Sequence, residues 1–465
     1  MPGAHTIGEL RRSEYRVLPV KSELRRNLIR KLQAGEALFP GIVGYSDSVI
    51  PQLENAILAG QDVVLLGERG QAKSRLVRSL TSLLDDSIPA VAGCEINDDP
   101  YRPVCRRCRE LVAELGDETP ITWLGPDDRY GEKLATPDTS IADLIGEVDP
   151  IKVAEGRYLS DELVIHYGLV PRTNRGIFAI NELPDLAERI QVGLLNIIEE
   201  RDVQIRGFRI RLPLDVFVVA TANPEDYTNR GRIITPLKDR FGAQVRTHYP
   251  RAVEDEIAIA EQERVVFDEM PVAVQVPQHM KEIAVEITHL ARRHPQVNQR
   301  SGVSVRVTTA NYETLVSNAL RRALVTGEKE AVARVSDLPA VLASTAGKVE
   351  LDTWEDAEDE QVLDKLVRTA CSNVFRRHFT AHELADLVQR FDRGGFTVEV
   401  GPLMPVESYR PAIEELPGLE RARQKLGEPG GLASMAAVLE FVLEGLHLGK
   451  RLNKTALEAT SLYGG

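Results

Sequence analysis

The sequence predicts an α/β protein with a parallel central sheet and flanking helices, followed by two helical regions. Three short apolar runs carry the prediction: 63–66, 177–180 and 216–220. None of them alternates with polar residues, as expected for parallel strands that are covered on both faces. Helical stretches separate the runs, which is typical of strands joined by crossover helices. Beyond residue 250 the apolar spacing becomes helical.

Composition excludes several classes of protein. The 465 residues include 57 Lys+Arg and 70 Asp+Glu, so the net charge of −13 argues against a protein that coats nucleic acid. No apolar run approaches the ~20 residues of a membrane helix, and the first residues lack the shape of a signal peptide. Four cysteines are too few for a disulfide framework. We therefore expect a cytoplasmic protein with no membrane partner.

The chain is predicted to have four parts. Residues 1–35 form a helical lead-in with Leu24, Leu28 and Leu32 on one face. Residues 36–250 form the α/β domain, with an irregular insertion at about 92–140. A helical domain follows over 251–330, and a helical C-terminal region over 331–465. Within the α/β domain, 203–213 alternates about a glycine as a β-hairpin does.

A glycine-containing turn follows the first predicted strand and fits the phosphate-loop pattern G-x-x-x-x-G-K-[ST], with alanine for the second glycine. It reads Gly67, Glu68, Arg69, Gly70, Gln71, Ala72, Lys73 and Ser74. Such a loop aims backbone N–H groups at phosphates, at a helix N-terminus where the dipole favours anions. Lys73 would reach the β and γ phosphates, and the Ser74 hydroxyl would bind Mg²⁺. The sequence thus predicts ATP with Mg²⁺ as ligands, in a motif that Ala72 weakens without abolishing.

The second predicted strand ends in Asn181 and Glu182. In phosphate-loop motors this strand end supplies an Asp for the metal shell and a Glu that polarises the attacking water. Asn181 stands at the Asp position and brings no negative charge, so Mg²⁺ would be held more weakly. The alternative is a strand-end cap without a catalytic role.

Six segments, in order along the chain, resemble the AAA+ ATPases of the group that contains magnesium-chelatase subunit I and the MoxR-type chaperones. They are FPGIVG, GERGQAKS, GIFAINELPDL, ATANPEDY, PLKDRFG and SGVSVRVT. The resemblance covers about residues 36–325 and implies an AAA+ core with a helical lid at 251–330. It also implies partner-facing hairpins near 166–170 and 203–213, for which plain hairpins are the alternative.

The resemblance further implies roles for five residues. Ile42 and Val43 would pack against adenine, and Asn223 would be sensor 1, which orients the hydrolytic water. Arg240 would be an arginine finger that reaches the ATP of a neighbouring subunit, and Arg306 would be sensor 2, touching the γ-phosphate. For each arginine the alternative is a solvated or surface ion-paired side chain. A finger that acts in trans implies a ring, a hexamer as in the family.

Three cysteines lie close together in the predicted insertion: Cys94, Cys105 and Cys108. The last two have a spacing that zinc sites use, and Asp98 or His166 could supply a fourth ligand. A single C-x-x-C pair is weak evidence, so reduced thiols without metal are the alternative.

Four functions are compatible with these observations. The first is an ATP-driven motor that remodels a partner protein, which in relatives carries a von Willebrand factor A domain. The second is the ATPase subunit of a tetrapyrrole metal chelatase, and the third a nucleotide-dependent scaffold with little turnover, because of Ala72 and Asn181. The fourth, a nucleic-acid translocase or transcription activator, is disfavoured by the acidic balance and by the lack of a GAFTGA loop.

Overall fold

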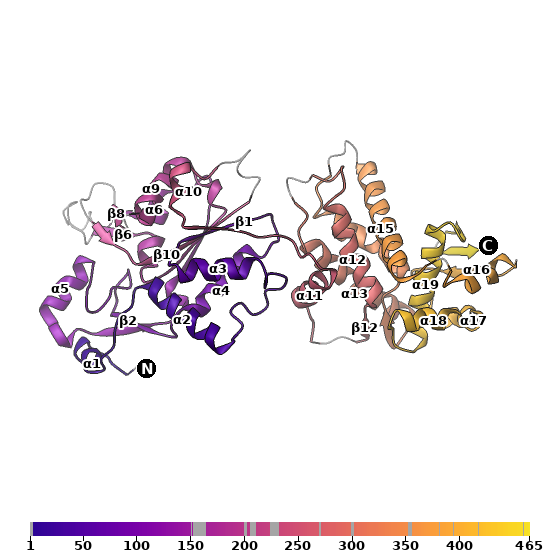
Figure 1. Cartoon of the computed structure of the whole chain (residues 1–465), viewed down its shortest axis with the longest axis horizontal. Helices are drawn as coiled ribbons and strands as arrows, with labels where there is room; N and C mark the ends of the chain where they lie inside the picture. The colour runs from indigo at the N-terminus through magenta and orange to yellow at the C-terminus, as the bar shows by residue number, and fades with distance from the viewer. Residues whose placement is uncertain are drawn as a thin grey trace. The chain divides into compact units, whose positions relative to one another are not determined.

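The computed structural model divides the chain into two compact units, Met1–His248 and Tyr249–Gly465 (Figure 1). Each unit is described by itself. The structure describes residues 3–149, 151, 164–199, 202–204, 211–223, 232–268, 271–298, 302–351, 356–380, 382–393, 395–416, 418–458 and 460–465.

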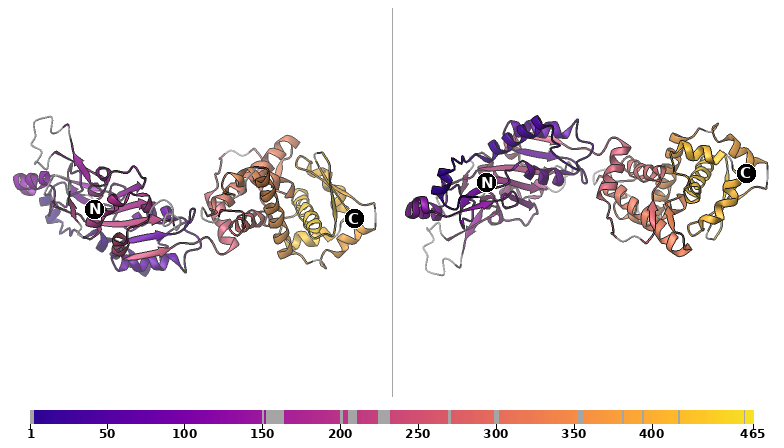
Figure 2. Two further views of the ribbon diagram at one scale, coloured as in Figure 1. Left: turned by 90° about the horizontal axis from the view of Figure 1, so that it is seen from above. Right: turned by 90° about the horizontal axis from the view of Figure 1, so that it is seen from below.

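A five-stranded parallel sheet forms the centre of the first unit, in the order β11-β1-β10-β7-β4 (Figures 1 and 2). The strands are β1 (Val63–Leu66), β4 (Tyr130–Leu134), β7 (Gly176–Asn181), β10 (Val216–Ala222) and β11 (Ala243–Arg246). The three predicted strands are β1, β7 and β10. They lie in the middle of the sheet and are buried from end to end, apart from Asn181 at the tip of β7.

Helices cover both faces of this sheet, which explains why its central strands lack alternation. Val63 and Leu65 pack on one face, in a core shared with α2 (Val20–Ala34), α3 (Val49–Leu58) and α4 (Lys73–Ser79). Val64 and Leu66 pack on the other face, with α9 (Glu188–Glu199) and α10 (Thr235–Arg240). Successive side chains of a strand point to opposite faces, so both sets must be apolar.

The predicted irregular insertion at 92–140 is wrong in part. Its residues 130–134 are β4, the edge strand of the central sheet, paired in parallel with β7. The sequence YGEKL is not recognisable as a strand, because an edge strand is covered less fully than a central one and need not be apolar throughout. Leu134, for example, is 58% exposed. The insertion also contains α5 (Arg106–Leu115) and β3 (Ile121–Leu124), and β3 pairs in antiparallel with β2 (Ile88–Val91), which precedes the insertion.

The predicted helical lead-in consists of α1 (Ile7–Arg12) and α2. Leu24 and Leu28 are buried as predicted, whereas Leu32, one turn further, is 43% exposed. A buried ion pair fastens α2 to the domain: Arg129 donates from Nη1 and Nη2 to the two carboxylate oxygens of Glu23, at 2.8 and 2.6 Å. Such bidentate pairing satisfies both charges, which burial would otherwise make costly.

Two further antiparallel strand pairs belong to the first unit. In one, β5 (Gly146–Val148) pairs with β6 (Ile165–Tyr167), and in the other β8 (Asp202–Gln204) pairs with β9 (Arg211–Pro213). The predicted hairpin at 203–213 is thus confirmed in its strands, while 205–210 lie outside the described residues. The remaining helical segments are α6 (Ile141–Leu144), α8 (Leu169–Arg172), η1 (Leu80–Leu83), η2 (Gly116–Glu118), η3 (Asp127–Arg129) and η5 (Leu183–Asp185).

The second unit is mainly helical, as predicted. Its helices are α11 (Val253–Glu263), α12 (Gln278–Ala291), α13 (Arg306–Thr326), α14 (Val341–Ala346), α15 (Asp356–His378), α16 (Ala385–Asp392), α17 (Arg410–Glu415), α18 (Gly418–Lys425), α19 (Leu432–Leu448), η7 (Val335–Ala340) and η8 (Val406–Tyr409). Its strands are β12 (Ala273–Gln275), β13 (Glu330–Val332), β14 (Val398–Val400), β15 (Asn453–Ala456) and β16 (Ser461–Gly464). The last three form an antiparallel sheet that the sequence did not predict.

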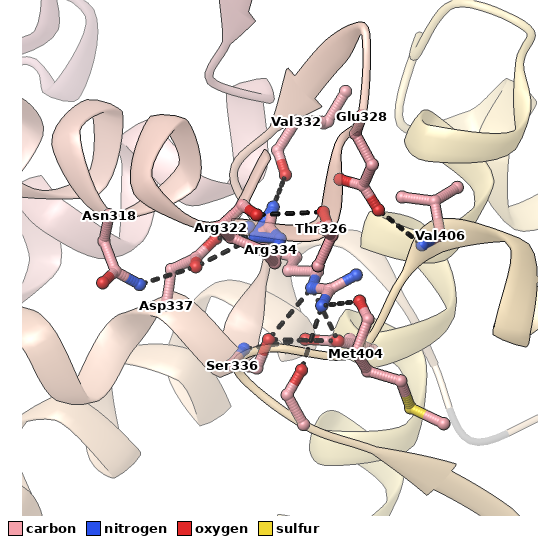
Figure 3. A network of polar contacts seen from close by, with 12 residues as sticks. Asn318, Arg322, Thr326, Glu328, Val332, Arg334, Ser336, Asp337, Met404 and Val406 are labelled. Atoms are coloured by element: carbon pink, nitrogen blue, oxygen red, sulfur yellow. Dashed lines mark hydrogen bonds and ion pairs between the residues drawn. The ribbon is translucent and has the colours of Figure 1, made fainter. Parts of the chain in front are cut away.

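Buried arginine side chains link separate segments of the second unit (Figure 3). Arg322 of α13 pairs with Asp337 at 3.0 Å and donates to the Val332 carbonyl at 2.6 Å. Arg334 pairs with Glu440 of α19 at 3.1 Å. The largest apolar core of this unit also draws on both sides of residue 330. In the part of the chain that the structure describes, every helix is too short or too polar to span a lipid bilayer.

Candidate functional site

The candidate site lies where the central strands end. The predicted phosphate loop connects β1 to α4, which begins at Lys73, and Asn181 and Asn223 lie at the ends of β7 and β10. Because the strands are parallel, these carboxyl ends meet at one edge of the sheet. Three segments that are far apart in the sequence therefore converge there.

The loop backbone explains the glycines of the motif. Gly70 has a φ of 75°, and Ala72 has a φ of 54° and ψ of 18° immediately before α4. A left-handed conformation costs a residue with a side chain roughly 1–2 kcal/mol. Ala72 is therefore strained as well as bulkier than the usual glycine. A Cβ at Gly67 would lie 1.8 Å from Oγ1 of Thr247, so this glycine is required for packing.

Lys73 is buried, and its ammonium group is held by oxygen atoms. Nζ donates to the carbonyl oxygens of Gly67 and Glu68, the latter at 2.9 Å, and to Oδ1 of Asn223 at 2.6 Å. The side chain therefore folds over the loop, toward the end of β10. A cation at this position, beside a helix N-terminus, can bind phosphate oxygens.

Asn223 extends this contact to Glu182. Its Nδ2 donates to Oε2 of Glu182 at 2.6 Å, so Lys73, Asn223 and Glu182 form one chain of hydrogen bonds. Glu182 has a left-handed backbone, with φ 55° and ψ 48°, and its N–H donates to Oγ1 of Thr221 at 3.1 Å. The structure thus brings three of the predicted site residues together, and Thr221 positions one of them.

Glu132 is a residue of this site that sequence reasoning missed. Asn181 donates from Nδ2 to its Oε1, and Arg78 of α4 donates from Nε to its Oε2 at 2.8 Å. Burial alone would raise the pKa of Glu132, but the hydrogen bonds from Arg78, Tyr130 and Asn181 outweigh it and lower the pKa. Glu132 is therefore a carboxylate at neutral pH. The sequence contains no motif around Glu132, and the edge strand that holds it was not predicted, so nothing in the sequence pointed to this residue.

The residues at the strand ends fit Mg²⁺, which prefers oxygen ligands. Ser74 is exposed in the first turn of α4, and Asn181 Oδ1 lies 3.4 Å from Oγ1 of Thr221. The side-chain amide of Asn181 has no negative charge, but the Glu132 carboxylate, which accepts a hydrogen bond from that amide, supplies one.

Ile42 and Val43 are half-buried in the loop before α3, and Ile42 packs against the core. This loop is linked to the phosphate loop by Tyr45, whose hydroxyl lies 2.8 Å from the Gln71 carbonyl oxygen. Burial raises the pKa of Tyr45 to about 12, so the hydroxyl stays protonated and can donate. Contact with adenine stays a prediction.

The two predicted arginines lie on α10 and α13. Arg240 ends α10 and precedes β11, and the N–H of Ala243 donates to the carbonyl of Asp62, which precedes β1. Arg240 therefore lies toward the amino-terminal edge of the sheet, opposite to Lys73. Arg306 is the first residue of α13, is exposed, and belongs to the second unit. Their catalytic roles stay predictions.

The cysteines of the insertion do come together. Sγ atoms of Cys94, Cys105 and Cys108 and a carboxylate oxygen of Asp98 all lie within 4.8 Å of one another. His166, the other predicted fourth ligand, is outside this group and lies beside Arg172.

A phosphate loop between the first strand and helix of a parallel sheet, with polar side chains at the ends of the two neighbouring strands, is the arrangement of the phosphate-loop class of nucleotide-binding α/β folds. Curated proteins similar to the chain are subunits of magnesium chelatase. The 38 kDa subunit of Cereibacter sphaeroides is 31% identical over 224 residues, 48% of this chain and 61% of that protein. Subunit ChlI of a Nostoc species is 26% identical over 323 residues, 65% of this chain and 81% of that protein.

These relatives confirm the predicted resemblance to the AAA+ group that contains magnesium-chelatase subunit I. The chain spans about three fifths of the length of the Cereibacter relative. No protein-family model matches the chain. Among solved structures, one chain of a magnesium-chelatase complex of subunits BchI and BchD aligns with this chain at 22% identity and a TM-score of 0.36. The alignment covers 70% of this chain and 98% of the other.

Proposed function

We propose that the chain is an ATP-binding and ATP-hydrolysing motor of the AAA+ type. The observation that carries the proposal is the chain of hydrogen bonds from Lys73 through Asn223 to Glu182, at the carboxyl edge of the sheet. It joins the Lys73 ammonium, which can bind phosphate oxygens, to the Glu182 carboxylate, which can accept a proton from water. The relatives in magnesium chelatase support the same conclusion.

In this proposal each residue has one task. The loop N–H groups and the Lys73 ammonium bind the phosphates, so Lys73 exchanges its present oxygen partners for phosphate oxygens. Glu182 accepts a proton from the attacking water, and Asn223 orients that water and the carboxylate. Ser74 and Asn181 would hold Mg²⁺, which supplies positive charge against the phosphate oxygens.

Arg240 completes the site of a neighbouring subunit. Its place beyond the amino-terminal edge of the sheet supports an action in trans, because Lys73 lies at the opposite edge. A guanidinium suits this task because its charge is fixed and its donors match phosphate oxygens. For Arg306 we propose the role of sensor 2, which touches the γ-phosphate. Hydrolysis would then depend on assembly into a ring, which we propose is a hexamer.

The motor would act on a partner protein, and a protein with a von Willebrand factor A domain is the partner class we propose. A second candidate function is the ATPase subunit of a metal chelatase, which the names of the relatives favour. The two differ in the partner and share the same ATP chemistry.

A nucleotide-dependent scaffold is the third candidate, favoured by the strained Ala72 and by the amide of Asn181. It is separated from the motors by ATP turnover. We expect turnover in the wild type that rises with protein concentration as subunits assemble, and none in Lys73→Ala. Absence of turnover at every protein concentration, with ATP still bound, would leave only the scaffold.

The partner is tested with Glu182→Gln, which should bind ATP and remain assembled. A pulldown with this variant and ATP, followed by identification of the retained proteins, should yield a specific partner. Lys73→Ala is the matched control, since it should retain nothing in an ATP-dependent way. Equal retention by both variants would contradict an ATP-driven action on a partner.

A further inference from the structure

Three thiols and a carboxylate form a compact group away from the nucleotide site. Cys94 follows β2, and Asp98 lies four residues on. Cys105 is the N-cap residue of α5, and Cys108 lies in the first turn of that helix. One ligand atom from each lies within 4.8 Å of the other three. Asp98, Cys105 and Cys108 are buried and Cys94 is partly buried, so the four side chains face one another and not solvent.

The backbone around this group favours thiolates. The N–H groups of Ile96 and Asp98 both point to Sγ of Cys94, at 3.4 Å, and the N–H of Cys108 points to Sγ of Cys105 at 3.3 Å. N–H donors around a sulfur favour its charged form, which is the form that binds metals. Two of the three sulfurs thus already have the N–H donors that stabilise a metal-bound thiolate.

Asp98 provides an independent indication of a missing partner. Its side chain is fully buried, and its Oδ2 accepts a hydrogen bond from the Cys105 N–H at 3.0 Å. In the described part of the chain, nothing donates a hydrogen bond to Oδ1 of Asp98, although this atom is inaccessible to solvent. Buried carboxylate oxygens are normally hydrogen-bonded or bound to a metal.

We propose that Cys94, Asp98, Cys105 and Cys108 bind one Zn²⁺ as a structural site. Three sulfurs and one oxygen are a ligand set that Zn²⁺ accepts in tetrahedral geometry. Zn–S bonds of about 2.3 Å place sulfurs about 3.8 Å apart in a tetrahedron, so the group needs only a small contraction from 4.8 Å. All four positions are filled by protein, which is typical of a structural and not a catalytic zinc.

Local charge supports a metal site. Three thiolates and one carboxylate exceed the charge of one Zn²⁺, so the site stays anionic. Arg107 donates to the Gly93 carbonyl at 2.5 Å, immediately beside Cys94. Its guanidinium lies where it can offset the remaining negative charge.

The zinc would hold a loop that is fastened to the start of β7. Asn97 donates to the carbonyl of Arg172 at 3.0 Å, and Asn174 donates to the carbonyl of Ile96 at 3.0 Å. These contacts join the loop to the residues that precede β7. The site therefore stabilises the first unit from the end of β7 opposite to Asn181, and takes no part in the chemistry.

The direct test is the metal content of the full chain, expressed with zinc and purified under reducing conditions without chelators. We expect one zinc per chain by elemental analysis. Exchange for Co²⁺ should give the strong visible bands of a tetrahedral site and a sulfur-to-cobalt charge-transfer band. Both measurements are independent of ATP hydrolysis, so they remain informative if the proposed function fails.

Variants identify the ligands. Cys108→Ser should lose the zinc and unfold at a temperature several degrees lower, and Asp98→Asn should weaken zinc binding and shift the cobalt spectrum. Cys371→Ala is the matched control, because Cys371 is buried in the second unit, far along the chain from the group. It should keep the full metal content.

Two results would overturn the proposal. One is a wild-type chain that is folded and reduced yet contains no zinc and gives no tetrahedral cobalt spectrum. The other is a disulfide among the three cysteines in the chain as isolated, with no metal bound. Since both concern the wild type, a variant that fails to fold leaves the test intact.

Discussion

The side-chain amide of Asn181 donates a hydrogen bond to Oε1 of Glu132 at an N···O distance of 2.5 Å, across the β7–β4 pair. The contact places a carboxylate beside the position where phosphate-loop motors carry an Asp. The negative charge at this point therefore comes from β4 and the amide from β7, an arrangement that we call the exchange. Arg78, on the second turn of the phosphate-loop helix, holds the same carboxylate.

This exchange predicts that Asn181→Asp alone lowers ATP turnover. Two carboxylates at this distance repel, and one of them takes up a proton. The double variant Asn181→Asp, Glu132→Gln restores one amide and one carboxylate and should recover turnover. We expect Glu132→Gln alone to raise the Mg²⁺ concentration for half-maximal turnover by about tenfold, the loss of one charge-assisted contact. A single Asn181→Asp variant as active as the double variant would contradict the exchange.

Ala72→Gly should stabilise the first unit. The left-handed φ of 54° is unfavourable for alanine and free for glycine, so we expect the free energy of unfolding to rise by about 1 kcal/mol. Ala59→Gly is the control, since Ala59 is also exposed but has a φ of −82°. There glycine relieves no strain and adds backbone freedom to the unfolded chain, so the same substitution should lower the free energy of unfolding. Urea unfolding measures both, and equal signs would show that Ala72 is unstrained.

Much of the fold could be predicted because its central strands are covered on both faces, so that every residue of β1 is apolar. The edge strand β4 was not predicted from the sequence because Glu132 and Lys133 interrupt its apolar pattern. The predicted site therefore lacked the carboxylate of Glu132. Contacts between distant residues are not visible in a sequence. The pairing of Glu23 with Arg129 and the choice of Asp98 over His166 both depend on the folded chain.

Thr221→Val should lower kcat more than ATP affinity. The hydroxyl of buried Thr221 accepts the N–H of Glu182, which has a left-handed backbone, and valine keeps the volume but removes the acceptor. Misplacing Glu182 should reduce kcat by about tenfold or more, because small errors in the position of a catalytic group are costly. Thr221→Ser keeps the oxygen and should retain most activity. Equal kcat in both variants would mean that Thr221 does not position Glu182.

Mixed assemblies test Arg240. Neither Arg240→Ala nor Lys73→Ala should hydrolyse ATP alone, whereas a mixture places an intact Lys73 opposite an intact Arg240 at some interfaces. We expect turnover to reappear in the mixture and to be highest near equal amounts. Lys238→Ala, an exposed neighbour in α10, should be active by itself. Without recovery at any ratio, Arg240 would not act in trans.

The central claim is that Lys73, Asn223 and Glu182 form one site, in which the first residue binds phosphate and the last activates water. The most direct test is parallel measurement of ATP binding and single-turnover hydrolysis in the wild type and in Glu182→Gln. We predict that the variant binds ATP about as tightly as the wild type and hydrolyses it at least about a hundredfold more slowly. Undiminished hydrolysis in Glu182→Gln would contradict the account.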